Sequence, residues 1–113
     1  MPFINTKYSG EITPEQEIDI KTALGEAVSI LGKSENWLMV GFEPNCSLYF
    51  KGEKSEKIAF VEVSVYGSAS KSAYEQFTAA VCKTLGNTLG VPADAVYVKY
   101  CPTENWGWNG GNF

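Results

Sequence analysis

The sequence contains no histidine, and all nine of its basic residues are lysine, so arginine is absent as well. Without histidine, Ser-His and Cys-His catalysis and histidine-based metal sites are excluded. Without arginine, bidentate recognition of phosphates and guanine edges is excluded, and the net charge of -4 argues further against a nucleic-acid partner. If the protein moves protons near neutral pH, its base must be a perturbed carboxylate, lysine, cysteine, tyrosine or α-amino group.

Cysteine and long hydrophobic runs are also scarce. Cys46, Cys82 and Cys101 form no Cys-x-x-Cys motif, so we expect buried reduced thiols rather than a zinc or redox site. No apolar run approaches the roughly 18 residues of a bilayer-spanning helix. The N-terminus lacks the basic and then apolar segments of a signal peptide. We therefore expect no membrane insertion and a cytoplasmic location.

The 113 residues that are present, 44% of them hydrophobic, fit a single domain spanning residues 1–113. The sequence predicts a first helix that begins at the N-cap Thr13, has Pro14 in its first turn and Gln16 in a capping box, and ends at Gly32. Its apolar face comprises Ile20, Ala23, Leu24, Ala27 and Leu31. A second helix is expected to start near Ser70 or Ser72 and to end at Gly90, before Pro92. Its apolar face comprises Tyr74, Phe77, Val81, Leu85 and Leu89.

Runs rich in valine and aromatic residues between these helices predict strands. The expected strands are Phe3 to Tyr8, Trp37 to Phe42, Leu48 to Phe50, Ile58 to Tyr66 and Ala95 to Cys101, with a polar turn over Lys51 to Lys54. In the last strand, Val96, Val98 and Tyr100 should share one face, and Tyr97 and Lys99 the other.

A shift of 58 positions superimposes the two halves of the chain, about 1–46 on 58–102. Leu31-Gly32 falls on Leu89-Gly90, and Val40 falls on Val98. Further matches are Pro44 with Pro102, Tyr8 with Tyr66, and Glu17 with Glu75. The pattern predicts an α+β fold in which two tandem β-α-β units form a four-stranded sheet with both helices on one face. The other face retains apolar side chains, and self-association would cover them.

Pro2 is the first candidate for chemistry. Cellular removal of Met1 would leave its nitrogen as a terminal secondary amine, which acts as a base only if its pKa is lowered. Burial in an apolar pocket and a nearby cation both have that effect.

Four segments together resemble the macrophage migration inhibitory factor family. They are Met1-Pro2 at the start of a strand, Leu31-Gly32-Lys33 at the end of the first helix, Val96 to Tyr100 in the last long strand, and the tail from Gly107 to Phe113. The resemblance covers nearly the whole chain. It implies a homotrimer without cofactor or metal, whose three active sites lie between subunits.

In that family, the residue matching Pro2 is the acid/base in keto-enol tautomerisation of phenylpyruvate-like or dopachrome-like substrates. The resemblance implies that Lys33 binds the carboxylate of a small aromatic keto acid and depresses the proline pKa. Tyr66 matches a position whose backbone amide contacts the substrate, and Tyr97 matches a tyrosine supplied by a neighbouring subunit. The aromatic walls implied by the resemblance are Trp37, Trp106, Trp108 and Phe113.

The chain departs from the mammalian cytokine of this family at two places. Lys99 stands where that cytokine has asparagine, so a second cation is expected near the substrate site, or else pointing away from it. Ile58 and Val61 replace its Cys-x-x-Cys, so thiol-oxidoreductase activity is not expected.

Two other functions remain open from the sequence. The first is a ligand secreted without a signal peptide that binds a cell-surface immune receptor, with vestigial tautomerase activity. The second is an oligomeric interaction domain without activity.

Overall fold

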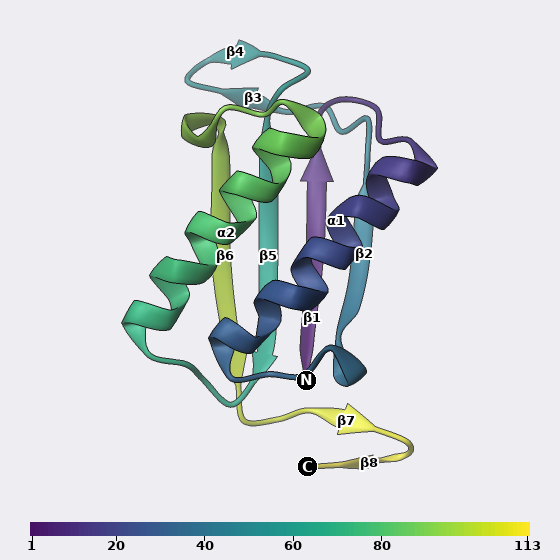
Figure 1. Ribbon diagram of the computed structural model, residues 1–113, viewed down its shortest axis with the longest axis vertical. Coiled ribbons are helices and arrows are strands. Elements are labelled where there is room, and N and C mark those ends of the chain that lie inside the picture. The colour runs from purple at the N-terminus through teal and green to yellow at the C-terminus, as the bar shows by residue number, and fades with distance from the viewer.

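The computed structural model describes residues 1–113 as one four-stranded sheet backed by two helices on the same face (Figure 1). The sheet has the order β2-β1-β5-β6. Its strands are β1 (Pro2–Tyr8), β2 (Met39–Glu43), β5 (Ala59–Tyr66) and β6 (Val96–Thr103). β1 pairs in parallel with β2, β5 pairs in parallel with β6, and the central pair β1 and β5 is antiparallel. The predicted α+β fold of two β-α-β units is therefore confirmed.

The helices begin where the sequence places them. α1 (Pro14–Ala27) has a full capping box, in which Thr13 Oγ1 accepts from the Gln16 amide and Gln16 Oε1 accepts from the Thr13 amide. α2 (Lys71–Leu89) is capped by Ser70, whose hydroxyl accepts from the Ala73 amide. Of the two candidate N-caps of this helix, Ser70 is the one used.

Several predicted boundaries need correction. The first α-helix ends at Ala27, and a 3₁₀ helix, Val28–Leu31, continues the chain to Gly32. Trp37 does not open a strand, because it closes a 3₁₀ helix, Glu35–Trp37, which Ser34 caps. A third 3₁₀ helix, Ala93–Ala95, precedes β6, which runs two residues further than predicted, to Thr103.

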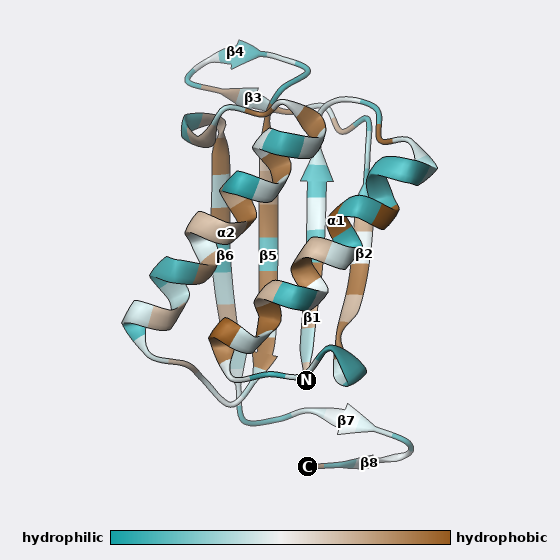
Figure 2. Cartoon of the chain, in the orientation of Figure 1, coloured by the Kyte–Doolittle hydropathy of each residue, from teal (hydrophilic) through white to brown (hydrophobic).

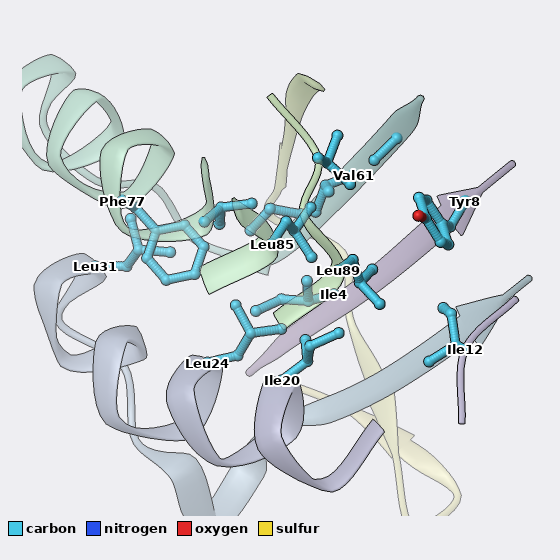
Figure 3. Packing of buried hydrophobic residues seen from close by; sticks show 14 of the residues in the cluster. Ile4, Tyr8, Ile12, Ile20, Leu24, Leu31, Val61, Phe77, Leu85 and Leu89 are labelled. Carbon is cyan, nitrogen blue, oxygen red and sulfur yellow. The ribbon is translucent and has the colours of Figure 1, made fainter. Parts of the chain in front are cut away.

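The core lies between the helices and the sheet. Ile20 and Leu24 of α1 and Leu85 and Leu89 of α2 point toward Ile4 of β1, and all are buried (Figure 3). On β5 the alternate residues Ala59, Val61, Val63 and Val65 are also buried, and this strand is coloured mostly as hydrophobic in Figure 2. The period-2 burial pattern of β1 and β5 shows that only one face of the sheet meets the helices.

The opposite sheet face is open in the single chain. It carries the half-buried Phe3 and Phe60, together with Met39 and Tyr97, which are 67% and 59% exposed. Val96, Val98 and Tyr100 pack instead against the core, which confirms the predicted division of the last strand into two faces. An exposed apolar face of this kind is uncommon in a monomer and typical of an interaction surface.

Two short hairpins extend the duplication beyond the predicted limits. β3 (Tyr49–Phe50) and β4 (Glu53–Lys54) form the first, so the expected polar turn is itself half strand. β7 (Gly107–Trp108) and β8 (Gly111–Asn112) form the second, 58 positions later. Each turn has two residues with positive φ, Lys51-Gly52 and Asn109-Gly110. The repeat therefore extends to the C-terminal hairpin.

The three cysteines are free, but each is half-buried rather than fully buried, which corrects the expectation of buried thiols. No helix in the structure combines the length and the apolar character that crossing a membrane requires.

Candidate active site

Pro2 lies at the start of β1, where it is buried and pairs with Val65 of β5. Met1 precedes it, at the end of this inner strand. The Met1 carbonyl accepts a hydrogen bond from the Tyr66 amide at 3.0 Å. The backbone around Pro2 is therefore held by the end of β5, and the Tyr66 N–H points at the residue that occupies the position before Pro2.

Lys33 reaches the same end of β5. Gly32, with φ of 72°, ends the 3₁₀ helix in the left-handed conformation and directs the chain toward Lys33. The Lys33 ammonium donates to the Tyr66 carbonyl at 2.8 Å. Gly67 has φ of 81°, and a Cβ there would lie 3.6 Å from Lys33 Nζ, so the backbone at this glycine closely borders the ammonium group. The amide and the carbonyl of Tyr66 thus contact Met1 and Lys33 respectively.

Burial and charge act together on the chain terminus. Burial, and then the positive charge of Lys33, lower the pKa of the Met1 amine below its ordinary value. Pro2 is buried, whereas Met1 is half-buried.

A line of aromatic rings leads away from this end of the sheet. Tyr66 packs against Phe113 with ring centroids 5.5 Å apart, and Phe113 stacks on Trp108 at 6.1 Å. Trp108 meets Trp37 edge to face at 5.0 Å. About half of Trp37, Trp108 and Phe113 remains exposed, at 46%, 53% and 52%. Three of the four predicted wall residues are thus brought together, with Tyr66 as a fourth ring.

Trp106 does not join this line of rings. It is half-buried and lines a pocket of about 560 Å³ that also includes Phe3, Met39 and Cys101. Its carbonyl accepts from the Phe113 amide at 3.1 Å. Its backbone therefore holds the C-terminal residue, while its direct contact with a substrate stays a prediction.

Tyr97 and Lys99 lie away from Pro2 within one chain. Val65, the partner of Pro2, pairs with Pro102, and Tyr97 lies five residues and Lys99 three residues before Pro102 in β6. At about 3.3 Å per residue, these separations are about 16 Å and 10 Å. Tyr97 instead meets Phe50 of β3 edge to face at 5.2 Å. A contribution of Tyr97 to a site would require a neighbouring subunit, as the resemblance implies.

Sequence reasoning missed two features of the site, namely Gly67 and the Met1 carbonyl. A lone glycine directly after a valine-rich strand was a signal for positive φ or close approach. Gly67 also pairs with Thr103, and both line a pocket of about 300 Å³. Nothing in the sequence could show that the Met1 carbonyl accepts a hydrogen bond from the Tyr66 amide.

A duplicated β-α-β sheet, with the terminal strand β1 and a lysine at one end of it, is the class of α+β fold that the resemblance in the sequence implies. Comparison with known proteins agrees. The whole chain, residues 1–113, matches the family "Macrophage migration inhibitory factor (MIF)". The chain therefore belongs to the macrophage migration inhibitory factor family, which confirms the resemblance found in the sequence.

Individual relatives cover almost the full chain. The crystal structure of Leishmania major MIF2 superimposes with a TM-score of 0.94 at 30% identity, covering 100% of this chain and 97% of that one. The macrophage migration inhibitory factor of Xenopus laevis is 26% identical, over 97% of this chain and 95% of its own. A fused 4-OT asymmetric trimer shares the fold, with a TM-score of 0.84 at 11% identity over 97% of this chain and 94% of that one.

Proposed function

We propose that this protein is a keto-enol tautomerase of phenylpyruvate-like or dopachrome-like substrates, with the Pro2 nitrogen as its general acid/base. The observation that carries the proposal is the position of Lys33, whose ammonium donates to the Tyr66 carbonyl at 2.8 Å at the end of the sheet where Pro2 is buried. Burial and this cation both lower the pKa of the Met1 amine there. Family membership supports isomerase chemistry in general. A base needs to be largely unprotonated near neutral pH, and these two effects act in that direction.

Removal of Met1 would prepare the site in two ways. It exposes the Pro2 nitrogen as a secondary amine. It also removes the carbonyl that accepts from the Tyr66 amide at 3.0 Å, so this N–H becomes a free donor beside the new terminus. An oxygen atom of the substrate would then take the place of the Met1 carbonyl.

The proposed reaction is an internal transfer of one proton. The Lys33 ammonium binds the carboxylate of the keto acid, which places the CH₂ carbon on the far side of the ketone beside the Pro2 nitrogen. Pro2 takes a proton from that carbon, the C–H electron pair forms the new double bond, and the carbonyl electrons move onto oxygen. The protonated Pro2 returns the proton to that oxygen, so no external reagent is consumed. The aromatic line of Tyr66, Phe113 and Trp108 would hold the aryl group.

We propose a homotrimer as the active assembly. The open face of the sheet supports it, because Met39 and Tyr97 are largely exposed there in the single chain. The fused 4-OT protein that shares this fold is itself a trimer. A neighbouring chain would then supply Tyr97, and with it Lys99, to each Pro2 site.

Replacement of the base tests the activity. Pro2→Gly should lower kcat/KM for phenylpyruvate by about 10²- to 10⁴-fold, the usual contribution of a positioned acid or base. A variant with one extra residue ahead of Pro2 should lose activity in the same way. Pro44→Gly is the matched control, since Pro44 is exposed and lies at the other end of the sheet. Full activity in the Pro2→Gly variant would show that another group is the base.

A receptor ligand with vestigial activity is the alternative function, and it rests on family membership alone. If the same Pro2→Gly variant kept undiminished binding to an immune-cell surface, the ligand function would be separate from the tautomerase site.

A further inference from the structure

The segment Gly67–Ser70, which joins β5 to α2, forms one border of the proposed site. It begins at the peptide bond between Tyr66 and Gly67, whose carbonyl accepts from the Lys33 ammonium at 2.8 Å. Gly67 borders Lys33 Nζ directly, as its positive φ and the close approach of the two groups show. The position of the Lys33 ammonium therefore depends on how this segment is held.

Two hydrogen bonds fix the segment. At one end, the Gly67 amide donates to the Thr103 carbonyl of β6 at 2.8 Å. In the middle, the Ala69 amide donates to the hydroxyl of Tyr74, in the first turn of α2, at 3.0 Å. The Tyr74 hydroxyl is thus the one side-chain group among these contacts, and it is the acceptor for the Ala69 amide.

The Tyr74 ring is itself clamped between α2 and β6. It lies 4.5 Å from the ring of Tyr100, centroid to centroid. The Tyr100 hydroxyl donates to the Tyr74 carbonyl at 2.9 Å and is 2.8 Å from the Thr78 hydroxyl. These contacts hold the Tyr74 side chain in one rotamer, so its hydroxyl is a fixed acceptor for the Ala69 amide.

We propose that Tyr74 is a positioning residue for the active site: through Ala69 and Gly67 it holds the Tyr66 carbonyl, and thereby the Lys33 ammonium, beside Pro2. This inference rests on the proposed function. Tyr74 itself does not touch the substrate. Without its hydroxyl, Ala69 loses its acceptor, the segment relaxes, and the ammonium moves away from the Pro2 nitrogen.

The test is Tyr74→Phe, which keeps the ring and removes only the hydroxyl that accepts from the Ala69 amide. We expect KM for phenylpyruvate to rise about two- to tenfold with little change in kcat, the effect of one lost hydrogen bond on carboxylate binding. The pKa of the Pro2 nitrogen, followed by NMR in the processed chain, should also rise toward its value in Lys33→Gln. The matched control is Thr78→Val, which removes a hydroxyl from the same cluster without touching Ala69, and it should leave both quantities unchanged.

The outcomes separate this inference from the proposed function. A wild-type protein without tautomerase activity would refute the function, yet the Pro2 pKa in Tyr74→Phe would still decide the role of Tyr74. An active wild type, with KM and Pro2 pKa unchanged in Tyr74→Phe, would overturn the positioning role. Equal shifts in Tyr74→Phe and Thr78→Val would also overturn it, since they would reflect only the loosening of the cluster.

Discussion

Two lysines of this chain make the same contact at opposite ends of the sheet. Lys33 Nζ donates to the Tyr66 carbonyl at 2.8 Å, and Lys57 Nζ donates to the Leu89 carbonyl at 2.7 Å. A Cβ on Gly67 would lie 3.6 Å from the first ammonium group, and a Cβ on Gly90 would lie 3.6 Å from the second. Only Lys33 also lies near the chain terminus. Variants of the two lysines can therefore separate the structural effect of a lysine–carbonyl hydrogen bond from an effect on catalysis.

We predict that Lys33→Gln raises KM for phenylpyruvate by about 10- to 100-fold, because a charged hydrogen bond to the carboxylate is lost. Lys33 also lowers the pKa of the terminal amine. Without this cation the amine stays protonated to higher pH, so the acid limb of the kcat/KM profile should shift upward in pH. Steady-state kinetics between pH 5 and 9 would measure both effects.

Lys57→Gln is the control for this experiment. It removes the same backbone contact, and it should leave KM and the pH profile as in the wild type. Equal losses in the two variants would mean that Lys33 serves only to hold the backbone.

At the scale of single elements, the C-terminal hairpin carries much of the aromatic line. Trp108 belongs to β7, and Phe113 follows β8 directly. Asn109 and Gly110 form the turn, with φ of 52° and 81°. Asn-Gly is the preferred sequence for such a turn, because both central residues need positive φ. The placement of the rings thus depends on one glycine.

We predict that Gly110→Ala raises KM for phenylpyruvate by about threefold to tenfold. Alanine has open space here, so the cost is backbone strain alone, about 1 kcal/mol. Gly111→Ala, in the same hairpin, also has open space but no positive φ, and it should leave KM unchanged. Kinetics of both variants, with tryptophan fluorescence to follow Trp108, would test this. A rise in KM in both variants would point to general disorder of the tail.

The helices and strands also show how much of the fold could be predicted from the sequence. The capping residues Thr13 and Ser70 and the valine pattern of β5 marked the helices and the central strand, because local hydrogen bonds and burial decide them. Of the two hairpins, only the strand at Leu48 to Phe50 was predicted, and it is present as β3, whereas β4, β7 and β8 were missed, since strands of two residues have no alternation to read. Trp37 was predicted to open a strand because tryptophan favours strands. Instead, Ser34 caps a 3₁₀ helix that ends at Trp37.

At the scale of the whole molecule, the site residues fall into two groups at opposite ends of the sheet. Pro2, Lys33 and Tyr66 meet at one end, while Tyr97 lies against Phe50 toward the other. The sequence itself made Pro2 a candidate, whereas only the family resemblance indicated Lys33, Tyr66 and Tyr97. Contacts between residues so far apart in sequence depend on the sheet order, which the pattern leaves open.

Mixing two inactive variants would test the shared site. We predict that Pro2→Gly and Tyr97→Ala chains, each of low activity alone, regain activity when unfolded and refolded together. In random trimers, about a quarter of the sites would combine an intact Pro2 with an intact Tyr97 from the neighbour. Tyr97 is 59% exposed in the single chain, so its loss should not unfold the subunit. Native mass spectrometry would report the mixed trimers.

A mixture that stays inactive although mixed trimers form would place both residues in the same subunit's site, or would remove Tyr97 from catalysis.

Figure 1 shows both chain ends at the same end of the sheet, with the β7–β8 hairpin beside the N-terminus. The Met1 carbonyl accepts a hydrogen bond from the Tyr66 amide, and the Phe113 ring packs on the Tyr66 ring. An affinity tag or reporter fused at either terminus would therefore disturb the groups around Tyr66 that form the proposed site. Purification handles should be cleaved without a scar, and dyes belong on the outer surface of α2, for example at the exposed Lys83.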